Sequence, residues 1–151
     1  MSIGSLLSIL KAFRGEELDP EQRKQLLHET LLLTLAGASS SDSYIAEIEV
    51  STIQRAIKEA IDVNVSEEDI RVAAESELLK AVPLETALQR LSGLLSDEDR
   101  MLVVTKLGDV IRSDSSVNQF ELDYFDRVVP ALQIPPSMLI GLAPLIATDG
   151  D

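Results

Sequence analysis

Acidic side chains recur at equivalent places in the two halves of this chain. Asp42 and Glu49 stand in the first half, and Asp114 and Glu121 stand 72 positions after them. Carboxylate oxygens are the ligands that hard divalent cations such as calcium, magnesium or manganese prefer in proteins. Four such groups brought to one region would form a metal site, and these four residues are therefore the candidate ligands.

Apolar positions on both sides of the acids also occur twice with the same offset. The matching pairs are Leu31 and Val103, Leu35 and Leu107, Ile45 and Val117, Ile53 and Phe125, and Ile57 and Val129. Spacings of four within each copy indicate helices. Each copy therefore predicts a helix, a polar bend that carries the aspartate, and a second helix with the glutamate in its first turn. A carboxylate at the edge of a core needs a cation, a hydrogen-bond donor or water.

Helix capping and ion pairing are alternative roles for the same acids. Asn118 and Glu121 have the spacing of a capping box, in which the glutamate accepts a hydrogen bond from a free backbone amide. Asp114 can close its own turn. Arg55 and Arg127 occupy equivalent positions in the two copies and could neutralise the acids. The residues alone leave both roles open.

Composition excludes several classes of site and partner. The 151 residues contain no cysteine and one histidine, which excludes disulfides, thiolate zinc sites and multi-histidine metal centres. The formal net charge of −13 argues against nucleic acids and anionic membrane surfaces as partners. Hydrophobic residues make up 45% of the chain but aromatics only 3%, so aliphatic side chains must form the core. This balance favours helices over sheets.

The same sequence predicts a protein of the cytoplasm. No apolar run approaches the roughly 18 residues that span a bilayer, so we expect no transmembrane segment. No basic region precedes the first apolar stretch, as it would in a signal peptide. Residues 3–14 form a predicted amphipathic helix with two basic side chains, which could touch a membrane surface. Packing on the bundle or on a second subunit is the more ordinary use of such a helix.

Periodicity and capping signals predict an all-α fold, a compact bundle of about seven helices with an internal pseudo-repeat of helical hairpins. The predicted helices cover about residues 3–14, 19–37, 45–61, 66–82, 83–93, 96–112 and 119–132. The second is apolar nearly all round between Leu31 and Ala36, which places it at the centre of the fold. We expect one globular domain in all, with residues 1–18 as an N-terminal helix and residues 19–151 as the main helical domain.

The bends and the helices that follow them resemble the Asp-Gly-x-hydrophobic-x-x-x-Glu signature of the TerB-like tellurite-resistance family. The segment from Gly108 to Glu121 matches best, followed by residues 132–135. Residues 95–100 are similar to the acidic, arginine-ended start of the preceding helix in short bacterial members. The resemblance covers roughly residues 20 to 140.

This resemblance implies an all-helical fold with an internal repeat, an association with stress responses, and acidic residues that bind metal ions. Those residues would be Asp42, Glu49, Asp114 and Glu121. The family's glycine after each aspartate is replaced here by serine, at positions 43 and 115. Glycine allows a positive φ angle that serine adopts only at a cost, so these bends can differ from those of the family.

We therefore expect a non-enzymatic binding or scaffolding module that works through a protein partner or self-association. One alternative is an acyl-carrier-like or other small enzyme-associated protein, because Asp42-Ser43 resembles the attachment site of a phosphopantetheine group. A second alternative is a plain protein-interaction domain whose acids only cap helices. His28 could act as a general base, but no nucleophile stands beside it in a recognisable setting, so a structural role is expected.

Overall fold

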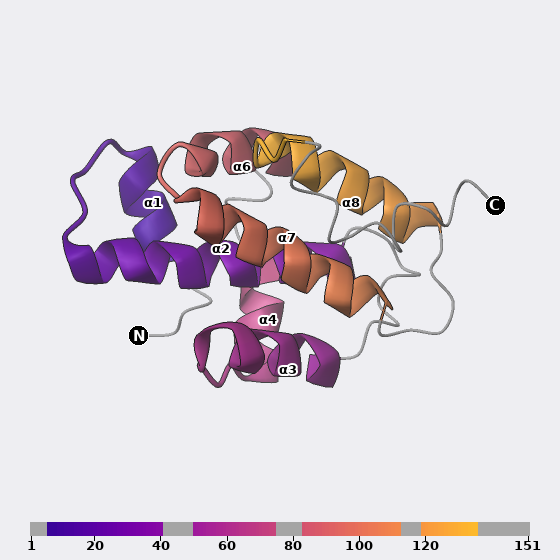
Figure 1. Cartoon of the computed structure of the whole chain (residues 1–151). Helices are drawn as coiled ribbons and strands as arrows, with labels where there is room; N and C mark the ends of the chain where they lie inside the picture. The colour runs from indigo at the N-terminus through magenta and orange to yellow at the C-terminus, as the bar shows by residue number, and fades with distance from the viewer. Residues whose placement is uncertain (1–5, 41–49, 75–82, 113–118, 136–151) are drawn as a thin grey trace.

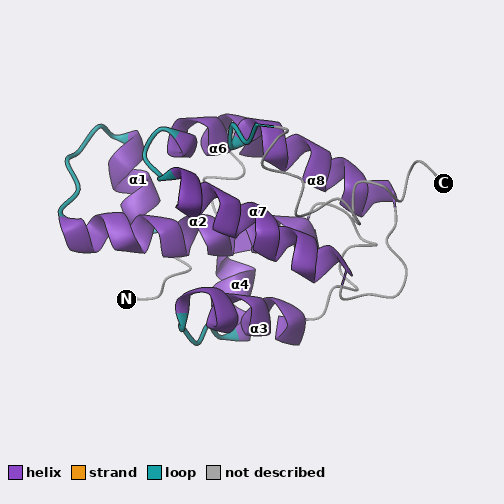
Figure 2. Cartoon of the chain, viewed as in Figure 1, coloured by secondary structure: helices purple, strands orange, loops and turns teal. Residues whose placement is uncertain are grey.

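The computed structural model describes residues 6–40, 50–74, 83–112 and 119–135. Seven helices and no strand lie within these ranges (Figure 1, Figure 2). The all-α fold predicted from the sequence is confirmed. The helices are α1 (Leu7–Phe13), α2 (Pro20–Ser40), α3 (Val50–Ile61), α4 (Glu67–Ala74), α6 (Leu84–Ser92), α7 (Asp97–Arg112) and α8 (Gln119–Ala131).

Helix α2 forms the centre of the bundle, as its apolar composition predicts. It contacts α1, α3, α4, α7 and α8. Five of its apolar side chains, at positions 31, 32, 33, 35 and 36, have no exposed surface. Despite its length, neither α2 nor any other helix in the described ranges combines the extent and hydrophobicity that crossing a membrane requires.

The internal repeat is visible in the placement of the helices. Helix α2 ends at Ser40 and helix α7 ends at Arg112, 72 positions later, and each precedes a second helix, α3 or α8. The paired apolar residues that the structure describes are buried in both copies: Leu31 and Val103, Leu35 and Leu107, Ile53 and Phe125, and Ile57 and Val129. The repeated pattern therefore encodes two hairpins that contribute equivalent side chains to one core.

Local side-chain chemistry sets the first residues of three helices. Asp19 and Gln22 exchange two hydrogen bonds at the start of α2, with distances of 3.0 and 2.8 Å between each backbone nitrogen and the partner's side-chain oxygen. Ser66 and Asp69 do the same before α4, at 3.0 Å each. Before α7, the amide of Asp99 donates to the hydroxyl of Ser96. These caps satisfy amide groups that a helix start leaves free.

Arg100 ties the start of α7 to the end of α8. Its Nη1 atom donates to the carbonyl oxygens of Leu132 and Gln133, at 3.2 and 3.3 Å. Its other terminal nitrogen pairs with Asp97 on the first turn of its own helix. A guanidinium at the C-terminal end of α8 also opposes the partial negative charge of that helix end. The acidic, arginine-ended segment noted in the sequence thus joins two helices.

The N-terminal helix differs from its prediction in where it begins and which face it buries. Leu6 has a φ angle of 55° and precedes the first helical residue, Leu7. The apolar residues of this segment that are spaced by three and four include Leu6 and Leu10, which predicts that both lie on the buried face. Leu6 and Ile9 are buried, whereas Leu10 is 37% exposed. Periodicity cannot separate neighbouring faces in so short a helix, and contact with α2 decides which face is buried.

The prediction that the second helix ends at Gly37 is wrong, because α2 continues to Ser40. Gly37 instead lies where α8 approaches closely. The hydroxyl of Tyr124 donates to the carbonyl oxygen of Thr34 at 2.7 Å. A Cβ atom at Gly37 would lie 2.5 Å from that hydroxyl oxygen. The glycine therefore serves packing between helices and does not terminate one. Burial also raises the pKa of Tyr124, which keeps the hydroxyl a donor.

We expect Gly37→Ala to lower the free energy of unfolding by about 1–3 kcal/mol, because the new methyl group overlaps the hydroxyl of Tyr124. In a Tyr124→Phe background the nearest ring atom would lie 3.5 Å from the new Cβ atom at position 37, which is an ordinary contact distance. There the same substitution should stabilise by up to about 1 kcal/mol, since alanine favours helix over glycine. Urea denaturation of the two single variants and the double variant measures this coupling. An equal cost of Gly37→Ala in both backgrounds would contradict it.

Candidate functional site

Three of the four predicted ligands, Asp42, Glu49 and Asp114, lie outside the described residues. Glu121 lies in α8, but its side chain is likewise outside the description. The helix ends that border the two bends can be followed in Figure 1. The end of α2, the start of α3, the end of α7 and the start of α8 all lie towards the right-hand end of the bundle.

Charged side chains on α3 and α7 pair with one another. Asp109 on α7 accepts a hydrogen bond from Arg112 at 3.0 Å and lies 3.6 Å from the ammonium group of Lys106. Lys106 also reaches Glu59 on α3, at 3.4 Å. Among the residues that the structure describes, no group of three or more histidines or carboxylates could hold a metal ion. A cation site would therefore need side chains outside the described part of the chain, which include the four predicted ligands.

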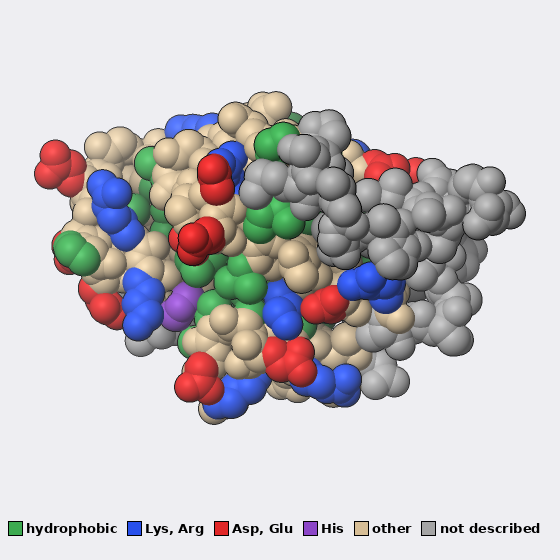
Figure 3. Space-filling view, viewed as in Figure 1, with side chains coloured by type: hydrophobic (Ala, Val, Ile, Leu, Met, Phe, Trp, Pro, Cys, Tyr) green, Lys and Arg blue, Asp and Glu red, His purple; other side chains and the backbone are tan. Residues whose placement is uncertain are grey.

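The negative charge of the chain is not gathered into one patch on the face shown in Figure 3. Acidic and basic side chains alternate over the described helices on this face. A dispersed arrangement of this kind favours solubility and gives no strong local field to attract a cation. Overall acidity therefore does not by itself argue for a metal site.

A buried carboxylate beneath α1 is a feature that the sequence analysis missed. Glu29 on α2 is only 4% exposed. It accepts a hydrogen bond from the backbone amide of Ile9 at 3.1 Å, and Ser8 donates to it as well. Glu29 thus caps the N-terminus of α1 from another helix. The spacing of Leu26, Glu29 and Leu33 by three and four could have indicated that this glutamate shares a buried face.

A basic side chain lies at the other end of α1. Arg90 on α6 donates from Nη2 to the carbonyl oxygen of Phe13, the last residue of α1, at 3.2 Å. Its guanidinium carbon also lies 4.2 Å from the centre of the Phe13 ring, within the range of cation–π attraction. Glu29 and Arg90 therefore hold opposite ends of the same short helix.

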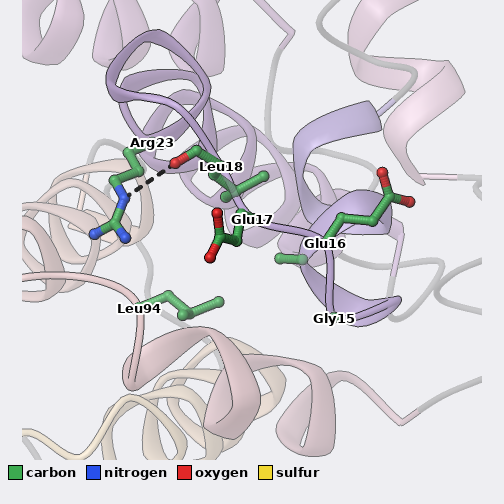
Figure 4. Close-up of a pocket in the computed structure, with 7 residues that line it drawn as sticks. Gly15, Glu16, Glu17, Leu18, Arg23 and Leu94 are labelled. Atoms are coloured by element: carbon green, nitrogen blue, oxygen red, sulfur yellow. Dashed lines mark hydrogen bonds between the residues drawn. The ribbon is translucent and has the colours of Figure 1, made fainter.

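A small hollow lies beside the connection between α1 and α2 (Figure 4). Its volume is about 220 Å³, below the roughly 300–1,000 Å³ of typical ligand sites. Arg23 and Glu17 border it together with Leu94, which is 49% exposed. The Nε atom of Arg23 donates to the carbonyl oxygen of Leu18 at 3.5 Å. The hollow contains no group arranged for proton transfer or nucleophilic attack.

His28 is placed as a structural residue. It is 7% exposed, and burial, followed by the charge of Lys24, lowers its pKa. Within the described residues, no hydrogen bond joins it to a serine or threonine hydroxyl that it could activate. The arrangement therefore does not support its use as a general base for a nucleophile.

The pKa shifts of His28 and Glu29 make the free energy of unfolding depend on pH in opposite directions. Burial raises the pKa of the Glu29 carboxyl, so its stabilising contribution is present at low pH and is lost as the pH rises through the raised pKa. Burial lowers the pKa of His28, so its contribution is present above about 6.5 and is lost as the pH falls through the lowered pKa.

We expect Glu29→Gln to remove the first of these effects. As the pH falls from 7 towards 4.5, wild-type protein should gain free energy of unfolding relative to this variant. Against His28→Gln, the matched control, wild-type protein should lose it over the pH range around and below 6.5. Urea denaturation at several pH values measures both differences. A difference between wild type and Glu29→Gln that stays constant with pH would contradict the prediction.

Comparison with known proteins identifies the family of the chain. No match was found among curated proteins or among solved structures. The family model described as tellurite resistance protein TerB matches residues 28–143. The match spans most of α2 and all of the later helices, including both hairpins and both bends. It begins after α1, so the N-terminal helix and its connection lie before the matched region. On the extent of this match, the chain belongs to the TerB tellurite-resistance family.

Proposed function

We propose that this chain is a non-enzymatic binding module that binds a divalent cation with acidic residues at its two bends and presents a surface to a protein partner. The observation that carries the proposal is the duplicated hairpin. Two copies bury the same apolar positions, and the helix ends that border both bends lie towards one end of the bundle. Asp42, Glu49, Asp114 and Glu121 are the proposed ligands.

The supporting argument is one of symmetry and charge. The repeat places an aspartate and a glutamate at matching positions of two hairpins, which gives four carboxylates in all. No lysine or arginine lies between the aspartate and the glutamate in either copy. A bound divalent ion relieves the repulsion among carboxylates that lie close together. The ion pairs described on α3 and α7 involve Glu59, Lys106 and Asp109, which are already matched to one another.

We expect calcium, magnesium or manganese to raise the melting temperature of the wild-type protein. At an ion concentration 100 times the dissociation constant, binding to the folded state adds about 2.7 kcal/mol. For a chain of this size the melting temperature should rise by roughly 8 °C. Melting curves followed by circular dichroism, with each ion and with chelator, measure the shift. The double variant Glu49→Gln/Glu121→Gln should lose it.

The matched control is Glu67→Gln/Glu98→Gln, which removes two exposed acids from the first turns of α4 and α7. It changes the net charge by the same amount, so any general effect of charge on ion binding appears in it as well. We expect this control to keep the ion-dependent shift. Equal melting temperatures with and without every ion would reject the cation site and leave the acids as helix caps.

A further inference from the structure

The charged groups beneath α1 favour one direction of the helix that lies on them. The carboxylate of Glu29 meets the N-terminal amide of Ile9, and the guanidinium of Arg90 meets the C-terminal carbonyl of Phe13. A helix carries partial positive charge at its N-terminus and partial negative charge at its C-terminus. An acid and a base placed in this order therefore favour one orientation and disfavour the reverse.

We call this surface the α1 seat and define it by Glu29 on α2 and Arg90 on α6. Apolar contacts add to these two charged groups. Leu6 and Ile9 from the N-terminal segment are at most 1% exposed and belong to the central cluster. A helix of seven residues is not stable alone in water. Helix α1 therefore depends on the seat for its conformation, and the seat depends on a helix of this kind to stay covered.

A short connection, residues 14–19, holds α1 on its own seat. Gly15 within it has a φ angle of 78°, which side-chain-bearing residues rarely adopt. A Cβ atom at this position would meet nothing within 4 Å, so only the backbone conformation requires glycine. The ion pair between Arg14 and Glu16 is largely exposed and holds the connection weakly. The turn between α1 and α2 therefore requires one residue, Gly15, in the left-handed backbone conformation.

We propose that the α1 seat also takes α1 of a second copy of this chain, giving a domain-swapped dimer when the connection at residues 14–19 opens. Both arrangements contain the same contacts with Glu29 and Arg90 and the same buried Leu6 and Ile9. They differ only in the connection and in the entropy of association, so a change at the connection shifts the balance. The inference rests on the proposed function as a binding module and names a second copy as one partner.

Substitution of Gly15 tests this directly. Gly15→Val strains the left-handed conformation of the closed connection, whereas an opened connection allows an ordinary φ angle. Because two strained connections are relieved in each dimer, we expect the dimer dissociation constant to fall by about 30-fold or more. Gly15→Asn is the matched control, because asparagine tolerates the left-handed region, and it should behave as wild type. Light scattering after size-exclusion chromatography, across protein concentrations and in the presence of chelator, gives the constants.

Hydrogen exchange tests whether α1 remains bound to a seat in the dimer. In a swapped dimer the amide of Ile9 stays protected, because Glu29 of the other copy accepts its hydrogen bond. A dimer of Gly15→Val in which the α1 amides exchange freely would show association through a different face and would overturn the proposal. So would a monomeric Gly15→Val protein at about 100 µM or higher. Chelator keeps these outcomes independent of the cation site, so failure of one proposal does not imply failure of the other.

Discussion

Helix α2 must be covered on every side, and the arrangement of the other helices follows from this requirement. Leu31, Leu32 and Leu33 are consecutive, so they point in three directions about 100° apart around the helix axis. All three have no exposed surface. No single neighbour can cover such a circumference, and α2 accordingly contacts α1, α3, α4, α7 and α8. The cost of exposing these side chains makes a surrounded central helix the stable arrangement.

Polar groups on α2 decide where two of these neighbours lie. The hydroxyls of Thr30 and Thr34 donate to carbonyl oxygens one turn earlier, at 2.7 and 2.8 Å, so they are satisfied within the helix. Two buried groups form hydrogen bonds between α2 and other helices. The carboxylate of Glu29 accepts from the amide of Ile9, and the buried hydroxyl of Tyr124 donates to the carbonyl oxygen of Thr34. Since a buried polar group without a partner is costly, these bonds fix the positions of α1 and α8 more specifically than apolar contact does.

The two hairpins share a plan but differ in what surrounds them. Helix α2 is central, whereas its counterpart α7 keeps a charged side that carries Lys106, Asp109 and Arg112. The same sequence pattern therefore forms α2, which is buried at the centre, and α7, which is partly exposed. The family match covers both hairpins, and α1 precedes it, so α1 is an additional contact made to α2 through Glu29 and to α6 through Arg90.

The sequence by itself determined the all-helical fold, the central place of α2 and the starts of α2, α4 and α7. These depend on interactions between residues three or four apart, such as Asp19 with Gln22, which periodicity and capping chemistry reveal directly. It also identified the repeat, because equivalent core positions need equivalent side chains. The candidate ligands at the bends remain a prediction of that repeat.

Only the tertiary structure decided the roles of Glu29, Gly37 and Arg90. Their partners, Ile9, Tyr124 and Phe13, are distant in sequence, and no local pattern states which helix will lie against which. Gly37 carries the signal of a helix end, yet the hydroxyl of Tyr124 makes it a point of close approach. Leu10 follows the apolar period, yet Ile9 is the residue buried. A short-range pattern specifies which side chains lie on one face of a helix, but the partner that covers that face is set by long-range packing.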